Sequence, residues 1–158
     1  MKTIKFTIIG LVMVLTGCAM NSAPPTLTPL EIQSLQTREY KQGKGIVFSS
    51  VLSVFQDLGY TVRSADKDTG LITAESAANS DVASMFLLGI SNVSQTSATA
   101  FVEKIGKITK VRLNFVTRNK ISYDGGQSDR QDTPILDARV YQNAFERIEN
   151  AIFVRSAN

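Results

Sequence analysis

The fold is decided by the stretch TAFVEKIGKITKVRLNFVT, residues 99–117. In its second half Val111, Leu113 and Phe115 alternate with polar residues, which is the pattern of an antiparallel strand buried on one face. Gly106 and Lys107 separate the two patterned halves at the position where a hairpin turns. We therefore predict two antiparallel strands, at residues 99–105 and 108–117, and we expect an open sheet edge near the end of the second strand.

A further hairpin is predicted upstream, with strands at residues 60–64 and 71–75, and residues 37–41 predict a first strand. Asp66 and Asp68 in the connecting loop are spaced like the opening of a calcium loop. The third acidic position and the distal glutamate of that motif are missing, so we interpret the segment as a turn. Residues 118–135, which include Gly125, Gly126 and Ser128, predict a polar loop.

Two segments have helical periodicity. The first has apolar residues at Val47, Val51, Val54, Phe55 and Leu58, and Gly59 follows as a C-terminal cap. The second starts after Asp137, a good N-cap, with Leu136 and Tyr141 spaced as a hydrophobic staple. Its apolar stripe consists of Tyr141, Ala144, Phe145, Ile148 and Ile152. Together these elements predict an α+β two-layer sandwich, in which an antiparallel sheet of about four to five strands carries two amphipathic helices.

The N-terminus has the pattern of an export signal. Lys2 and Lys5 precede a short apolar run that is too short to span a bilayer, and the run ends in Leu15-Thr16-Gly17-Cys18. This motif resembles the lipobox of bacterial lipoproteins, which implies cleavage between Gly17 and Cys18 and lipid attachment to the Cys18 thiol. Ala19 at the next position implies sorting to the outer membrane, with the domain facing the periplasm. We expect residues 1–17 to be a signal peptide.

The residues after Cys18 predict a tether. Residues 18–35 are rich in Pro, Ser, Thr and Asn, which favours a flexible linker, and residues 36–158 then form a single α+β domain. Leu30, Ile32 and Leu35 allow an alternative, in which a turn of helix docks on the domain.

Composition argues against catalysis. Among 158 residues there is one cysteine and no histidine, which removes the commonest general base and most zinc sites, so we expect no metal and no cofactor. The carboxylate pairs Asp66/Asp68 and Asp129/Asp132 lie in turn-like segments. Lys2 and Lys5 account for two of the 17 basic residues against 14 acidic ones, so the exported chain is nearly neutral and nucleic acid is not an expected partner.

Two segments are candidate interaction surfaces. Residues 81–93 contain an apolar group that consists of Met85, Phe86, Leu87, Leu88 and Ile90. This group favours a flap over a ligand groove, a helix that docks a partner or a helix that touches lipid. The alternative is that it simply packs on the core. A run of bases on the second hairpin and its exit favours either a contact with anionic lipid or an acidic partner, or a solvated edge. The run consists of Lys104, Lys107, Lys110 and Arg112, followed by Arg118 and Lys120.

Four motifs resemble those of a family of small, largely uncharacterised proteobacterial lipoproteins: residues 37–40 (TREY), 54–60 (VFQDLGY), 68–74 (DTGLITA) and 141–145 (YQNAF). The element order β-α-β-β-flap-β-β-α is also similar to the helix-grip domains of the accessory lipoprotein of the outer-membrane β-barrel assembly machine. The lipobox, the tether and the lack of catalytic residues, together with these resemblances, favour a non-catalytic accessory module that binds an envelope protein of an assembly or transport system. The alternatives are a carrier of lipid or a small apolar ligand and, more remotely, a cell-wall hydrolase.

Overall fold

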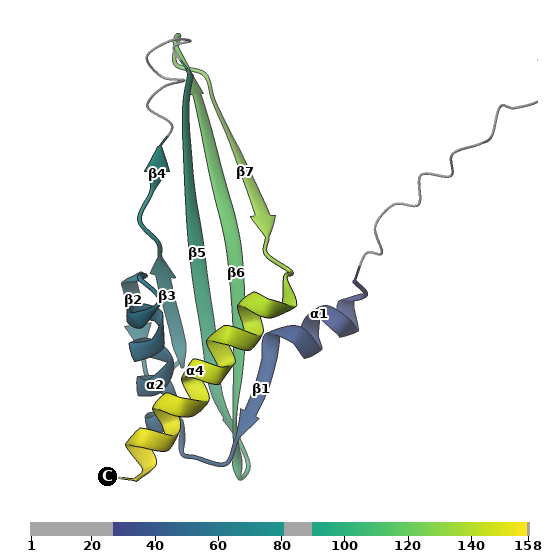
Figure 1. Ribbon diagram of the computed structural model, residues 1–158, viewed down its shortest axis with the longest axis vertical. Helices are drawn as coiled ribbons and strands as arrows, with labels where there is room; N and C mark the ends of the chain where they lie inside the picture. The colour runs from purple at the N-terminus through teal and green to yellow at the C-terminus, as the bar shows by residue number, and fades with distance from the viewer. Residues whose placement is uncertain (1–26, 81–89, 158) are drawn as a thin grey trace, which may run out of the picture.

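The computed structural model describes residues 27–80 and 90–157. In this part of the chain a seven-stranded antiparallel sheet packs against helices, so the predicted α+β sandwich is confirmed with more strands than expected (Figure 1). In chain order the elements are α1 (Pro29–Gln36), β1 (Thr37–Tyr40), α2 (Lys44–Asp57), β2 (Thr61–Asp66), β3 (Leu71–Glu75), β4 (Asn79–Ser80), β5 (Ile90–Ile105), β6 (Ile108–Tyr123), β7 (Ser128–Pro134) and α4 (Ala138–Ser156).

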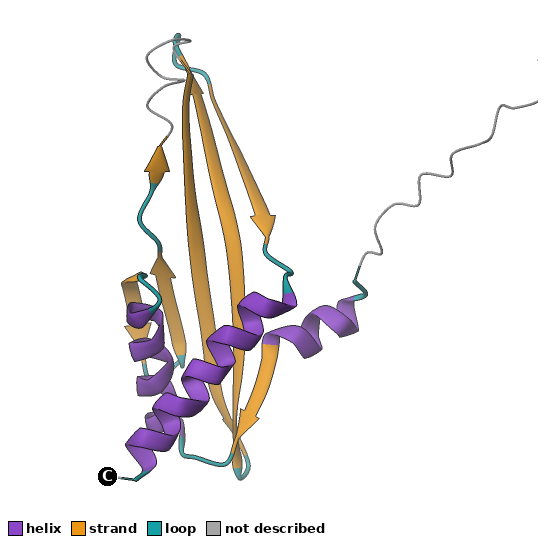
Figure 2. Cartoon of the chain, in the orientation of Figure 1, coloured by secondary structure: helices purple, strands orange, loops and turns teal. Residues whose placement is uncertain are grey.

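The long hairpin of β5 and β6 is the centre of the sheet. Its two strands pair without interruption from Ile90 opposite Tyr123 to Ile105 opposite Ile108. Gly106 makes the turn with a φ of 59°, a left-handed conformation in which glycine has no Cβ penalty. The strand order is β1-β6-β5-β3-β2, and β4 and β7 pair with β5 and β6 respectively (Figure 2).

The predicted polar loop is shorter than expected, because only the turn that contains Gly125 and Gly126 separates β6 from β7, and the open edge predicted near Thr117 is wrong. β6 continues to Tyr123, and β7 pairs with it, placing Thr117 opposite Thr133. The sequence does not predict β7, because all seven of its residues are exposed and neither face of the strand needs apolar side chains. We call β4, β7 and the paired residues 90–97 and 116–123 the arm. It extends beyond the helices (Figure 1).

The predicted helical stripes form the core. Val47, Val51 and Phe55 of α2 and the α4 stripe are buried, as are alternate residues of β3, β5 and β6. Phe115 stacks edge-on against Tyr141, with ring centroids 5.3 Å apart, and links the sheet to α4. Asp137 caps α4 by accepting a hydrogen bond from the backbone N–H of Arg139 at 2.9 Å.

A helix also lies within the segment predicted as a flexible tether. α1 starts with a capping box, in which the Thr28 backbone N–H donates to the Glu31 carboxylate at 2.7 Å and the Thr28 hydroxyl accepts from the Glu31 N–H. Leu30, Ile32 and Leu35 are therefore helical, as in the alternative interpretation. Among the described residues, the first helix therefore starts at Pro29, before residue 36.

Candidate functional site

The two faces of the sheet differ in what covers them. Val102 and Leu113 have exposed fractions of 0% and belong to the core beneath α2 and α4. Their neighbours Phe101 and Arg112 point to the opposite face and are exposed, because successive strand residues alternate between faces. We call this opposite side the outer face.

Two large apolar side chains lie together on the outer face. Leu71 of β3 and Phe101 of β5 are directly opposite in the strand register, and 45% and 43% of their surfaces are exposed. They border a hollow of about 390 Å³, which we call the outer groove. Its lining residues are Ile32, Gln36, Leu71, Thr99, Ala100, Phe101, Arg112, Asn114, Pro134 and Leu136.

A hydrogen-bonded group of side chains forms the polar wall of the outer groove. The Gln36 amide N–H donates to the Asn114 carbonyl and to the Tyr141 hydroxyl, each at 3.4 Å. The Gln36 carbonyl accepts from the Arg112 guanidinium at 3.2 Å. This network fixes the end of α1 against β6 and places a guanidinium beside Phe101, its register partner. The groove can therefore receive an apolar group flanked by a carboxylate or carbonyl oxygen.

Sequence patterning did not single out Leu71 and Phe101, although a signal for both was present. Each precedes a buried residue, Ile72 or Val102, in a strand. Two consecutive apolar residues in a strand place one on each face, so one of them must face away from the core.

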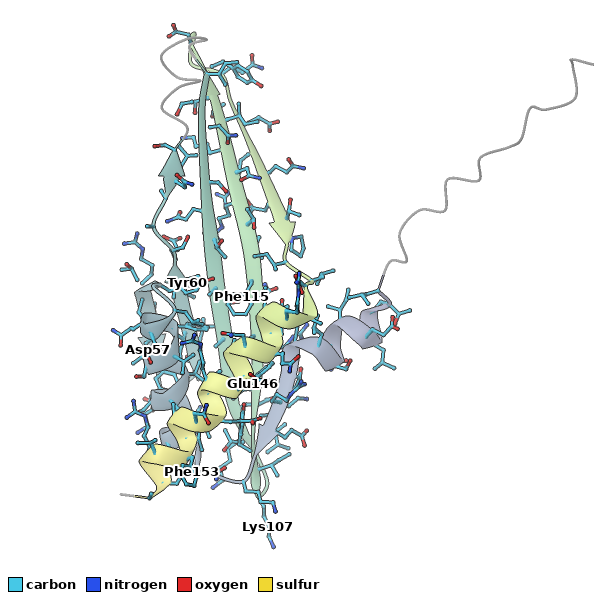
Figure 3. All side chains as sticks on the ribbon, in the orientation of Figure 1. Asp57, Tyr60, Lys107, Phe115, Glu146 and Phe153 are labelled. Atoms are coloured by element: carbon cyan, nitrogen blue, oxygen red, sulfur yellow. The ribbon has the colours of Figure 1, made fainter. Side chains whose placement is uncertain are left out.

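Four of the six residues of the predicted basic run, Lys110, Arg112, Arg118 and Lys120, occupy alternate positions of β6 on the outer face, and the other two lie elsewhere. Lys110 and Arg112 face outward, Lys104 is paired with Thr109 on the helix side, and Lys107 is at the tip of the hairpin (Figure 3). Lys110 lies between Glu103 on β5 and Glu39 on β1 in the register. Its charge is thus flanked by opposite charges.

Some predicted site residues lie outside the described residues: Gly17, Cys18 and the apolar group Met85, Phe86, Leu87 and Leu88. Ile90, the last member of that group, is described. It is half-buried and is the first residue of β5, where it pairs with Tyr123.

The candidate carboxylates have local partners. One Asp66 oxygen accepts hydrogen bonds from the backbone N–H groups of Asp68 and Thr69, at 2.9 and 3.4 Å, as in a turn. These bonds, Asp68 first, hold the pKa of Asp66 below its usual value. Asp132 is paired with Arg130 at 3.0 Å. Within residues 27–80 and 90–157, no group of three or more potential metal-ligating side chains comes together.

The space between the helices and the sheet is filled by aromatic rings. Phe55, Tyr60 and Phe115 have ring centroids 5.9–6.2 Å apart. A hollow of about 470 Å³ opens where α2 ends and α4 begins. It is lined by Leu58, Tyr60, Phe115, Asp137, Arg139, Val140, Asn143 and Ala144.

Comparison with known proteins does not assign the chain to a family. No protein-family model and no curated protein matches it. A solved structure of a DUF4468 family protein from Bacteroides ovatus is similar, with 8% identity and a TM-score of 0.38 over 84% of this chain and 91% of that one. At this TM-score the likeness carries no argument about function. None of the described helices is long and apolar enough to cross a membrane.

Proposed function

We propose that this chain is a lipid-anchored, non-catalytic binding module on the periplasmic side of the outer membrane, and that it holds an envelope protein of an assembly or transport system at its outer groove. The partner supplies a segment in which an apolar side chain lies next to an acidic one. The apolar group contacts Leu71 and Phe101, and the carboxylate pairs with Arg112.

The exposure of Leu71 and Phe101 carries this proposal. Both side chains lie next to core residues, yet nearly half of each surface remains open to solvent. Exposed apolar side chains that adjoin one another and have a polar rim are typical of protein interaction sites. Arg112 supplies a charge at that rim, and charge complementarity selects an acidic partner segment.

The position of α1 relates this site to the proposed anchor. Ile32 and Gln36 of α1 line the outer groove, and the helix starts at Pro29, eleven positions after Cys18. A flexible linker of this length has a root-mean-square reach of about 15–20 Å. Lipid on Cys18 therefore keeps the outer groove near the membrane surface, where an envelope partner is embedded.

In-cell photocrosslinking tests the proposal. A photoreactive residue at position 101 should form an adduct with one envelope protein, identified by mass spectrometry and recovered again when that protein is purified first. Leu71→Asn in the same chain should reduce the adduct about tenfold, because it removes the adjoining apolar contact. Position 153 is the matched control, since Phe153 is 75% exposed but belongs to α4.

A Cys18→Ser variant separates the anchor from the groove. It should lose incorporation of labelled palmitate and should also lose the adduct, because the domain is no longer held at the membrane. Equal adducts from positions 101 and 153, or none from position 101, would contradict the groove assignment. Palmitate labelling that persists in Cys18→Ser would contradict the anchor.

The second candidate function is the carriage of a lipid or a small apolar ligand. The hollow between the C-terminal end of α2 and the N-terminal end of α4 favours it. Leu58, Tyr60 and Val140 give that hollow an apolar lining. Native mass spectrometry of the full chain tests this alternative, because a co-purified lipid that is lost on Val140→Asp would support it. The absence of any bound lipid would remove it.

A further inference from the structure

A third hollow, separate from the outer groove, lies on the outer face of the arm. Its volume is about 290 Å³. Its lining residues are Glu75, Val93, Gln95, Arg118, Asn119, Lys120 and Arg130, which come from β3, β5, β6 and β7. We call it the arm hollow. Three of these side chains are cationic and one is anionic.

Ion pairs hold the guanidinium groups around the arm hollow in place. Glu75 accepts from Arg118 at 3.0 Å and from Arg63 at 2.9 Å. Asp132 binds Arg130 through two hydrogen bonds of 3.0 Å. Both carboxylates, those of Glu75 and Asp132, are therefore already paired with arginines. Of the ion-pair partners outside the lining, Arg63 adds one positive charge and Asp132 adds one negative charge, so these two cancel. The arm hollow keeps an excess of two positive charges.

Two donors in the arm hollow are unused. The Nε of Arg118 is buried and has no hydrogen-bond partner among the described residues, and its ion-pair distance to the Asp132 carboxylate is 3.8 Å. The Lys120 side chain makes no ion pair or hydrogen bond within the described residues, and Lys120 lies directly opposite Arg130 in the register. Like charges at opposed strand positions destabilise a sheet, so this arrangement favours an anion between them.

We propose that the arm hollow binds a phosphate group. Phosphate oxygens accept hydrogen bonds from guanidinium and ammonium groups together, and a phosphate monoester carries about the charge that the arm hollow leaves unbalanced. Lys120 and Arg130 bind it from β6 and β7, and Arg118 contributes its free Nε–H. The phosphate comes either from a lipid headgroup or from a soluble phosphate compound, and these two sources share the same chemistry.

Titration of the full chain with inorganic phosphate, at constant ionic strength, tests the site. The NMR signal of the Arg118 Nε–H should shift and saturate. Lys120→Gln should raise the dissociation constant about five- to tenfold, because one charge-assisted hydrogen bond is lost. Its melting temperature without phosphate should stay unchanged or rise, because the Lys120 side chain makes no hydrogen bond or ion pair among the described residues and lies opposite the like charge of Arg130. Lys107→Gln, at the distant hairpin tip, is the matched control and should leave binding unchanged.

Vesicles distinguish the two sources. Binding to vesicles of phosphatidic acid, whose headgroup is a phosphate monoester, and phosphatidylcholine indicates a lipid headgroup if it weakens in Lys120→Gln and exceeds binding to phosphatidylcholine alone. Saturation by inorganic phosphate, with vesicle binding insensitive to Lys120→Gln, indicates a soluble phosphate compound. If Lys120→Gln changes neither phosphate nor vesicle binding, or if no saturation occurs with either, the proposal is overturned.

Discussion

Tyr40 and Tyr141 are both buried, but only Tyr141 has a partner for its hydroxyl group. The Tyr141 hydroxyl donates to the Ile135 carbonyl at 2.9 Å and accepts from Gln36. The Tyr40 hydroxyl has no hydrogen-bond partner in the described residues. Burial of a polar group without a partner costs free energy, and burial with good partners is close to neutral or favourable.

We predict opposite effects of removing these two hydroxyl groups. Tyr40→Phe should leave the free energy of unfolding at pH 7 unchanged or raise it, whereas Tyr141→Phe should lower it by about 1–2 kcal/mol, because the Ile135 carbonyl loses its donor. Urea denaturation of the two variants measures both values. A destabilised Tyr40→Phe would show that the hydroxyl has a partner.

The Tyr40 variant should also change the alkaline limit of stability. Burial first, and the charge of Glu149 second, raise the pKa of Tyr40 above its usual value of 10.0. Above pH 10.0 the Tyr40 hydroxyl of the unfolded chain releases its proton while that of the folded chain keeps it, so the free energy of unfolding falls as the pH rises. The decline between about pH 9 and 11 should be shallower in Tyr40→Phe than in the wild type.

At the scale of single residues, sequence patterning predicted core positions better than binding positions. Val111, Leu113 and Phe115 are buried as predicted, because alternation reports which face the core covers. Phe101 was not recognised as part of a site, since an exposed apolar residue becomes informative only when its neighbour across the strands is known. That neighbour, Leu71, is 30 positions away in the sequence.

At the scale of elements, α2 and α4 were predictable and β7 was not. Helical stripes arise because one face of a helix must be buried, and both helices bury such a face. β7, with the sequence SDRQDTP, buries no side chain. It is held by backbone pairing with β6 and by the cross-strand ion pair of Asp132 with Arg118, at 3.8 Å, which leave no periodic signal.

This difference predicts uneven stability along the β5–β6 hairpin. Residues 98–102 and 111–115 contribute core side chains beneath the helices, whereas residues 90–96 and 116–123 of the arm bury none fully. Backbone amides in the arm should therefore exchange with deuterium at least about tenfold faster than those of the core half, because local opening there exposes little apolar surface. Uniform exchange rates along both strands would contradict this prediction. Mass spectrometry of peptides from each half measures the difference.

At the scale of the whole molecule, the sheet divides the tasks of stability and binding between its faces. The helix face holds the aromatic cluster, and the outer face carries the outer groove and the arm hollow. The helical stripes and the alternating strand residues in the sequence mainly indicate the helix face. Both candidate binding sites arise from strands that are distant in the chain, so only the assembled sheet reveals them.

This division predicts that the outer face can be changed without loss of the fold. The double variant Leu71→Asn/Phe101→Asn should lower the free energy of unfolding by about 1 kcal/mol or less, since these partly exposed side chains keep much of their contact with water in the folded state. Phe115→Ala should lower it by about 3–5 kcal/mol, because it leaves a cavity between Phe55 and Tyr141. Denaturation of both variants in urea provides the comparison. If the double variant lost as much stability as Phe115→Ala, Leu71 and Phe101 would belong to the folding core, and their exposure would no longer point to a partner.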